Sequence, residues 1–405
     1  MRVGLSAARA LIAWALAGTA VAQVLTDRSP LDPAPGQATL EFPDETPTIT
    51  AGTVTVRPTA GLSAAYDTNV LAQHAPRFER GLSIAEAQLK AEDDMNEMTL
   101  DSQIFARARR FFDAHDLDTT EYGGELGIQA PVGSRDEVTA RVLAEQRFEP
   151  HTEIETPSFL PVSLYNDWRA ETTYLHVFNR LSVRTDLSAQ GFDYADPTQH
   201  FRDYTSFREE LRAEYELTDG AFLVATPYHG RDDFSHFSPL VASANTTGAL
   251  AGIHLSVPEL FDYELTAGYF RRSYRALGST SGLSLRGTLL WQPTRLTTLR
   301  GELSRDDEPT RIPGAFGKAR TDISLELDHS YSEAVNLYAR TEWIRDDFEF
   351  IDRTDRTTLA EIGMALLIGR PWLLKVAYGF GTRSSPAATD SYSRHLVSVS
   401  LIGRL

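Results

Sequence analysis

Apolar residues recur at every second position in long stretches from about Val54 to Leu405, and no other feature of the chain constrains its fold as strongly. Residues 283–289, LSLRGTL, and 322–328, DISLELD, are two examples. Successive side chains of a β-strand point to opposite faces, so this period indicates strands whose two faces meet different media. The stretches run to roughly 10–14 residues, whereas about five or six are usual in soluble sheets. Strands of this length are typical of membrane-spanning β-barrels.

The whole pattern predicts an all-β protein, an antiparallel transmembrane outer-membrane β-barrel of about 18 strands, with 16 as the alternative. The expected spans are 53–66, 81–92, 97–111, 119–130, 137–148, 165–177, 181–194, 204–217, 221–234, 243–256, 262–274, 282–292, 297–308, 318–331, 336–350, 356–368, 372–384 and 391–405. Short connectors such as 93–96, 218–220 and 369–371 alternate with longer ones such as 151–164, 195–203 and 309–317. Bacterial barrels have short periplasmic turns and long extracellular loops, so the alternation predicts an even strand number and periplasmic termini.

Residues 1–22 have the form of a signal peptide. Arg2 and Arg9 are followed by apolar residues 10–17, and Ala20-Val21-Ala22 provides a cleavage site before Gln23. Residues 23–52 contain five prolines and few aromatic residues, which predicts a disordered periplasmic lead-in. The barrel is then expected over residues 53–405.

The formal charge of −17 argues against nucleic acid as a partner, because binding it depends on positive charge. The chain contains no cysteine. Barrels need no disulfides, because their backbone hydrogen bonds close on themselves. No pattern in the sequence predicts a cofactor or a metal site.

Aromatic residues gather near the predicted strand ends, as expected of the interfacial girdles of a membrane protein. They are Tyr66, Phe111, Phe148, Trp168, Tyr215, Phe222, Trp291, Tyr331 and Trp372.

In the last predicted strand, Val397, Val399, Leu401 and Leu405 share one face. This pattern is similar to the terminal signal of outer-membrane barrels, although the usual last residue of that signal is Phe. Pro227 interrupts a predicted strand and indicates a bulge or a strand end.

Charged residues at alternate positions would line the lumen, because a basic residue facing lipid costs roughly 2–4 kcal/mol. The residues predicted to line the pore are Arg141, Glu145, Arg147, Arg184, Asp186, Arg208, Glu210, Arg212, Glu214, Arg286, Arg340 and Glu342. Two interpretations stay open and are compatible. The charges form a cross-strand lattice that stiffens the wall, or they form a selectivity surface.

Two clusters of carboxylates and histidines have the residue types of catalytic or metal sites. One is Asp113, His115, Asp116 and Asp118; the other is His229, Asp232, Asp233 and His236. No motif carrying a nucleophile accompanies either cluster, so we expect no catalytic residues and no enzyme.

Several short motifs resemble the β-barrel porin 2 family, which includes barrels associated with capsule and exopolysaccharide export. The similar stretches are Tyr66-Asp67-Thr68-Asn69-Val70, Arg109-Arg110-Phe111-Phe112, Thr119-Thr120-Glu121-Tyr122-Gly123, Phe178-Asn179-Arg180-Leu181-Ser182, Trp291-Gln292-Pro293-Thr294 and Leu296-Thr297-Thr298-Leu299. Each is weak alone, but their order and spacing cover about residues 50–405. The resemblance carries no binding residues over to this chain.

The resemblance implies a pore in the outer membrane of a Gram-negative bacterium, serving as an exit conduit for secreted capsular polysaccharide or exopolysaccharide. A general diffusion porin for small solutes is the alternative, and a barrel enzyme or a structural scaffold is less favoured. The partners expected are outer-membrane lipid, lipopolysaccharide and a periplasmic polysaccharide-export component. The sequence predicts neither the transported substrate nor the oligomeric state.

Overall fold

The computed structural model describes residues 48–95, 97–153, 155–156, 162–236, 241–275, 277–312 and 314–404. The predicted signal peptide, most of the predicted lead-in and Leu405 lie outside these residues. Within the described ranges, no helix is long and apolar enough to cross a membrane.

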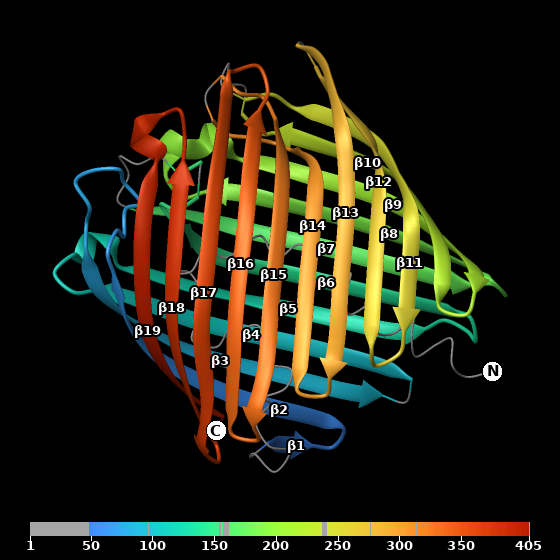
Figure 1. Cartoon of the computed structure of the whole chain (residues 1–405), viewed down its shortest axis with the longest axis horizontal. Helices are drawn as coiled ribbons and strands as arrows, with labels where there is room; N and C mark the ends of the chain where they lie inside the picture. Colours follow the sequence, from blue (N-terminus) through green and yellow to red (C-terminus); the bar gives the residue numbers. More distant parts are fainter. Residues whose placement is uncertain are drawn as a thin grey trace.

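In the described part of the chain, eighteen long antiparallel strands form one closed barrel (Figure 1). Each strand pairs with the next along the chain, and the last pairs with the first, with Leu396 opposite Asp67 and Arg404 opposite Thr59. The strands are β2 (Val54–Asp67), β3 (Arg80–Met95), β4 (Met98–Phe111), β5 (Thr119–Pro131), β6 (Asp136–Glu149), β7 (Ser163–Val177), β8 (Leu181–Tyr194), β9 (Tyr204–Thr218), β10 (Ala221–Phe234), β11 (Ala244–Val257), β12 (Phe261–Tyr274), β13 (Gly278–Thr294), β14 (Thr297–Glu308), β15 (Lys318–Ser332), β16 (Val335–Phe348), β17 (Arg353–Gly369), β18 (Trp372–Ser384) and β19 (Tyr392–Arg404). The predicted count of 18 is confirmed, and 16 is wrong.

A short strand, β1 (Ile49–Ala51), corrects the predicted boundary of the lead-in. Because β19 reaches only Thr59 on its edge of β2, residues 54–58 of that edge lie beyond β19. Strand β1 pairs with this remainder, with Ile49 opposite Val56 and Ala51 opposite Val54. It therefore continues the line of β19 and covers backbone groups that an edge would otherwise leave unpaired.

The connectors alternate in length as the sequence predicts, except that those between β12 and β13 and between β16 and β17 are short. One end of the barrel carries tight turns, such as 178–180, 219–220 and 333–334, and both described chain ends lie there. In the turn before β10, Gly220 has a φ of +73°, and a side chain on it would collide with the carbonyl oxygen of Ser256. The other end carries the longer connections, which include the 3₁₀ helices η1 (His115–Leu117), η2 (Pro197–Arg202) and η3 (Ala388–Asp390). By the usual asymmetry of bacterial barrels, the long connections form the extracellular end.

The outer face of the barrel is apolar. On β15, Ile323, Leu325 and Leu327 are exposed, and the alternate residue Asp328 is 2% exposed inside the barrel. On β19, the predicted outward residues Val397, Val399 and Leu401 are exposed as well. These rows provide the surface that lipid chains would cover.

Six of the nine predicted girdle residues lie exposed on this outer face: Tyr66, Trp168, Tyr215, Trp291, Tyr331 and Trp372. The prediction is wrong for Phe111 and Phe222, which occupy the inward positions of their strands. Phe111 packs with Leu82, and Phe222 stacks on His254, which is 1% exposed. Phe148 lies under the Arg109 guanidinium, 4.0 Å from its ring centre, and lines an internal pocket. Position near a strand end does not by itself determine the face; parity does.

Strand β10 continues through Pro227 without a bulge at that residue. Pro227 lies opposite Ala249 of β11, but on the β9 side the ladder lacks pairs at Thr226 and Pro227. A proline has no N–H to donate, so a gap in one ladder is its expected effect.

Candidate functional site

The lumen of the barrel is lined by charged side chains that pair with one another. On β9, Phe207, Leu211 and Tyr215 are exposed outward. The alternate residues, Arg208 and Glu210 among them, point inward, and Arg208 Nε donates to Glu210 at 2.8 Å. Since both charges are only partly exposed, their pairing offsets part of the cost of removing them from water.

Three ion pairs cross part of the lumen between strands that are separated by two to four others along the wall. Arg208 of β9 lies 2.9 Å from Asp306 of β14, although four strands separate them along the wall. Arg286 of β13 holds Glu210 by two contacts of 3.0 Å. The Arg212 guanidinium of β9 donates to Glu264 of β12 at 2.6 and 2.8 Å. These contacts require the wall formed by β9 to β14 to curl tightly, so side chains fill that part of the lumen.

A second set of contacts fills the same sector nearer its extracellular end. Arg272 of β12, which is 1% exposed, lies 2.7 Å from both Asp232 and Asp307. Tyr228 donates to Asp306 at 2.9 Å and packs with Phe270. Together with the crossing ion pairs, these residues occupy the part of the lumen beside β9 to β14.

On β6, β8 and β16, the predicted pore-lining residues pair along the wall instead of across the lumen. Arg184 lies 2.8 Å from Asp186 on the same strand. The corresponding distances are 3.4 Å for Arg147 and Glu145, 3.0 Å for Arg141 and Glu125, and 3.5 Å for Arg340 and Glu342. Glu214, the last of the predicted set, contacts Arg212 and lies 3.4 Å from His254. The structure thus places both kinds of pairing, along the wall and across it, on the inward face.

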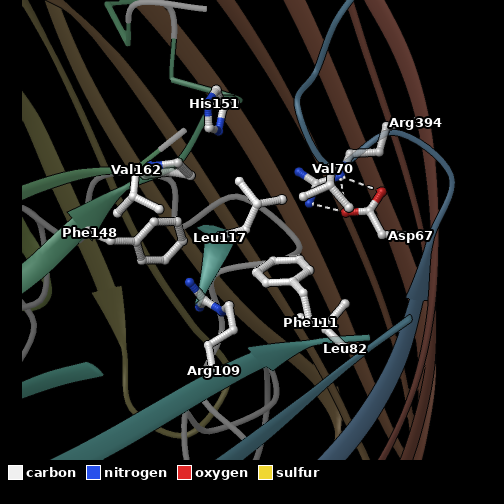
Figure 2. Close-up of a pocket in the computed structure, with 11 residues that line it drawn as sticks. Asp67, Val70, Leu82, Arg109, Phe111, Leu117, Phe148, His151, Val162 and Arg394 are labelled. Carbon is white, nitrogen blue, oxygen red and sulfur yellow. Dashed lines mark hydrogen bonds and ion pairs between the residues drawn. The ribbon is translucent and has the colours of Figure 1, made fainter. Parts of the chain in front are cut away.

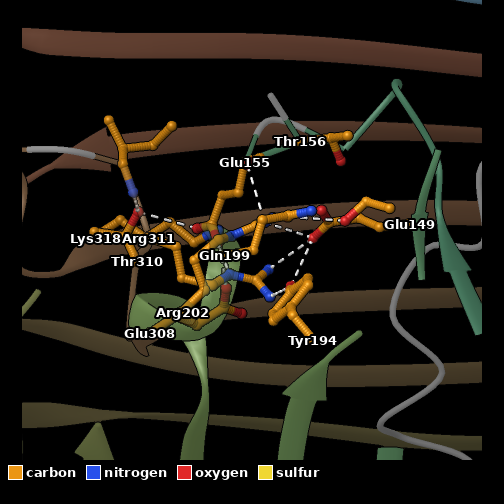
Figure 3. A network of polar contacts seen from close by, with 12 residues as sticks. Glu149, Glu155, Thr156, Tyr194, Gln199, Arg202, Glu308, Thr310, Arg311 and Lys318 are labelled. Atoms are coloured by element: carbon orange, nitrogen blue, oxygen red, sulfur yellow. Dashed lines mark hydrogen bonds and ion pairs between the residues drawn. The ribbon is translucent and has the colours of Figure 1, made fainter. Parts of the chain in front are cut away.

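In the connection between β6 and β7, the described residues 150–153, 155, 156 and 162 lie at the extracellular mouth, and we call these residues the mouth loop. Strands β6 and β7 lie in the far wall of Figure 1, behind β14 to β18. Glu155 of the mouth loop is 8% exposed and accepts hydrogen bonds from Thr310 at 3.0 Å, Lys318 at 3.2 Å and Arg311 at 2.5 Å (Figure 3). Because Lys318 belongs to β15, this carboxylate joins the two walls.

Further contacts hold the mouth loop at its base and on its other side. Arg202 of η2 donates to both carboxylate oxygens of Glu149 at 2.8 Å and to the main-chain oxygen of Glu155 at 3.0 Å (Figure 3). Arg383 of β18 donates to the main-chain oxygen of Thr152. The mouth loop is therefore fixed to β15, to β18 and to the β8–β9 connection.

Charge around the mouth loop explains the shifted pKa values of its acids. Burial alone would raise the pKa of Glu155, but Lys318 and Arg311 outweigh it and hold that pKa far below its ordinary value of 4.5. Burial raises the pKa of Glu153, and the nearby Arg320 and Lys318 offset this only in part. The first carboxylate is thus bound as an anion, whereas the second is easier to protonate.

Beside the mouth loop, the connections after β2 and β4 fold over the lumen and enclose a small apolar core. Val70, Leu82, Phe111 and Leu117 pack together there, and they line one side of a pocket whose other side includes His151 of the mouth loop (Figure 2). The Asp67–Arg394 ion pair closes the pocket where the first and last barrel strands meet (Figure 2). Packed side chains therefore line this part of the mouth.

The structure does not bring the side chains of either histidine-containing cluster together as a whole. His115 is 83% exposed and lies 3.4 Å from Asp118. His229 lies on the outer face of β10, near Thr247, whereas Asp232 points into the lumen toward Arg272. Within the described residues, no group of three or more histidines and carboxylates is arranged to hold a metal ion.

Sequence reasoning missed the residues of the mouth: Glu149, Glu155, Arg202, Arg311 and Lys318. They lie in long connections or at strand ends, where the period of two no longer applies. Charge was the available signal, since acids in one long connection, 150–162, match bases in others. Nothing in that pattern says which connection folds inward.

The sequence matches one family of known proteins. The model of the family described as "Putative beta-barrel porin 2" matches residues 43–405. No curated protein matches the sequence.

Solved structures of similar shape include three Pseudomonas proteins. OpdK from Pseudomonas aeruginosa, solved with vanillate, has 8% identity and a TM-score of 0.47, with 86% of this chain and 99% of that chain covered. A BenF-like porin from Pseudomonas fluorescens has the same four values. OccK2 (OpdF) from Pseudomonas aeruginosa has 10% identity and a TM-score of 0.48, over 86% and 98% of the two chains. Similarity at this level carries no information about what this chain transports.

Proposed function

This chain belongs to the β-barrel porin 2 family and is an outer-membrane β-barrel porin, and we propose that it is a passive diffusion channel for small hydrophilic solutes. The contact of Glu155 with Lys318 and Arg311 across the mouth carries the proposal. A loop fixed across the entrance limits the size of whatever passes, while the charged inner wall keeps the passage wet.

Polysaccharide export, the function implied by the sequence resemblance, is the less favoured of the two candidates. An extended sugar chain needs one continuous passage through the barrel. Here the mouth loop spans the entrance and side chains from β9 to β14 occupy part of the lumen. Export of a polymer would require both the mouth loop and these side chains to move out of the passage. A periplasmic export partner stays a prediction that only the polysaccharide route needs.

Liposome swelling tests the proposal. The purified barrel, reconstituted in liposomes, is exposed to a size series from monosaccharides to long oligosaccharides. We expect fast swelling with monosaccharides and a steep decline as the sugar grows. Equal rates for long oligosaccharides would contradict a small-solute channel.

A strain lacking the chain should keep its surface polysaccharide, and polymer trapped in the periplasm of that strain would instead favour export.

We further propose that the chain is exported to the outer membrane of a Gram-negative bacterium by residues 1–22. Cell fractionation and mass spectrometry of the mature protein test this. Outer-membrane recovery with Gln23 as the first residue is expected, whereas recovery in the soluble fraction with Met1 retained would contradict it.

A further inference from the structure

Three arginines form a row on the outer face of the barrel, close to its extracellular end. Arg305 of β14 lies opposite Thr321 of β15, Thr321 lies opposite Arg345 of β16, and Arg345 lies opposite Arg356 of β17. Each lies three residues from the extracellular end of its strand. With neighbouring strands about 4.8 Å apart, the row extends over roughly 15 Å of the barrel wall.

The row points toward the membrane and not into the lumen. On β16, the alternate residues Glu342, Ile344 and Asp346 are buried on the inward side. Arg345 lies on the other face, with 41% of its side chain exposed, and Arg356 is exposed too. The row therefore faces whatever surrounds the barrel at that height.

On β14, β15 and β16, the next outward positions toward the membrane centre are apolar. Leu303, Ile323 and Trp343 lie opposite one another on β14, β15 and β16, and Ile323 is 45% exposed. Tryptophan is typical of the level of lipid headgroups. The arginine row therefore lies at the boundary between lipid chains and headgroups in the outer leaflet.

The charges of the row are only partly balanced by the protein. Asp347 forms ion pairs with two members of the row, at 2.9 Å from Arg345 and 3.6 Å from Arg305. Arg345 and Arg356 lie directly opposite each other, and like charges in that relationship destabilise a sheet. Among contacts of the described residues, Arg356 makes no ion pair. An anion outside the protein would relieve this repulsion.

We propose that Arg305, Arg345 and Arg356 bind the phosphate groups of a glycolipid in the outer leaflet, with its acyl chains against Leu303, Ile323 and Trp343. Arginine suits phosphate because its planar guanidinium donates two parallel hydrogen bonds. Charge and position together select this ligand, since a phosphate carried on acyl chains meets both the basic row and the apolar band below it.

Native mass spectrometry of the full-length barrel in detergent tests the proposal, with bisphosphorylated lipid A and chemically dephosphorylated lipid A as probes. We expect the phosphorylated form to bind more tightly, by about fivefold for each arginine engaged. The triple variant R305Q/R345Q/R356Q should lose that preference. The variant R231Q is the matched control, because Arg231 also lies outward near the extracellular end but is balanced by Asp233 at 2.6 Å.

Equal binding of the two probes by the wild type, or an undiminished preference in the triple variant, would overturn the proposal. Displacement of lipid A by an equal concentration of inorganic phosphate would also overturn it, because it would mark a simple anion site. Should the triple variant fail to assemble, the comparison of the two probes on the wild type still decides. Planar-bilayer conductance of the triple variant should match the wild type, which separates this proposal from the function of the channel.

Discussion

Arg394 of the last strand donates hydrogen bonds to Asp67 of the first barrel strand, from Nε at 2.9 and 3.0 Å and from Nη2 at 2.5 Å. Both side chains are almost fully buried. Strands β2 and β19 are the two ends of the barrel sequence, so this ion pair closes the ring where no turn connects its members. Four residues away along β2, Ser63 shares a hydrogen bond of 2.6 Å with Ser400 across the same seam.

Removing one member of this pair should weaken the closed barrel. D67N leaves the Arg394 guanidinium buried opposite a neutral amide, which costs about 3–5 kcal/mol when a buried ion pair is broken. Urea unfolding of the reconstituted barrel measures the loss. The control is D233N, whose partner Arg231 is 60% exposed, where about 0–1 kcal/mol is expected. Equal losses of stability in the two variants would mean that the Asp67–Arg394 ion pair contributes no more than an exposed ion pair.

The outward face of β15 should tolerate charge far less than its inward face. Leu325 is 44% exposed outward, between Gly301 and Thr341 of the neighbouring strands. L325R should cost roughly 2–4 kcal/mol in a bilayer, because it places a cation against lipid chains. The adjacent inward substitution S324R serves as the control and should assemble with near-normal stability. The reverse order would show that the two faces have been assigned wrongly.

Ion pairs that cross the lumen should affect conduction more than those along the wall. R208Q removes contacts with Glu210 of its own strand and Asp306 of β14, whereas R184Q removes only a contact within β8. We expect a change in single-channel conductance for R208Q and little change for R184Q. Identical conductance in both variants would indicate that the passage does not run beside the β9–β14 sector.

Mild acid should not release the mouth loop. The pKa of Glu155 is lowered in the folded protein, so its stabilising contribution is present above the ordinary carboxyl pKa of 4.5 and disappears only when the pH falls through the lowered value. The pKa of Glu153 is raised, so protonating it as the pH falls through that value favours the buried position. Between pH 7 and pH 5, single-channel conductance should therefore not increase. A stepwise increase in this window would contradict both assignments.

The period of two was sufficient to predict the barrel because it reports the two environments of every strand directly. Strand β9 illustrates this: Phe207 and Leu211 face out and Arg208 and Glu210 face in, as their parity requires. The same rule explains why Phe111 faces inward: its parity determines its face, and its distance from a strand end does not. Parity determines the face of a residue but not its partner, so the contact of Arg208 with Asp306 across the lumen was beyond prediction.

The contacts at the extracellular mouth could not be predicted from the sequence. Glu155 lies in a connection with no regular period, and its partners Arg311 and Lys318 are more than 150 residues away in the sequence. Whether such a connection folds inward depends on contacts among several loops at once. Short-range sequence patterns do not predict those contacts.

Conductance of the variant E155Q tests the small-solute channel most directly. Breaking this buried pair costs about 3–5 kcal/mol, or a factor of about 100 or more in the population of the docked mouth loop. The control E308Q removes a contact with the same Lys318, at 3.5 Å, from a carboxylate that is 43% exposed and outside the loop. We predict that E155Q raises single-channel conductance and admits oligosaccharides that the wild type and E308Q exclude. Unchanged conductance and an unchanged size limit in E155Q, with the barrel properly assembled, would contradict the claim that the mouth loop limits passage.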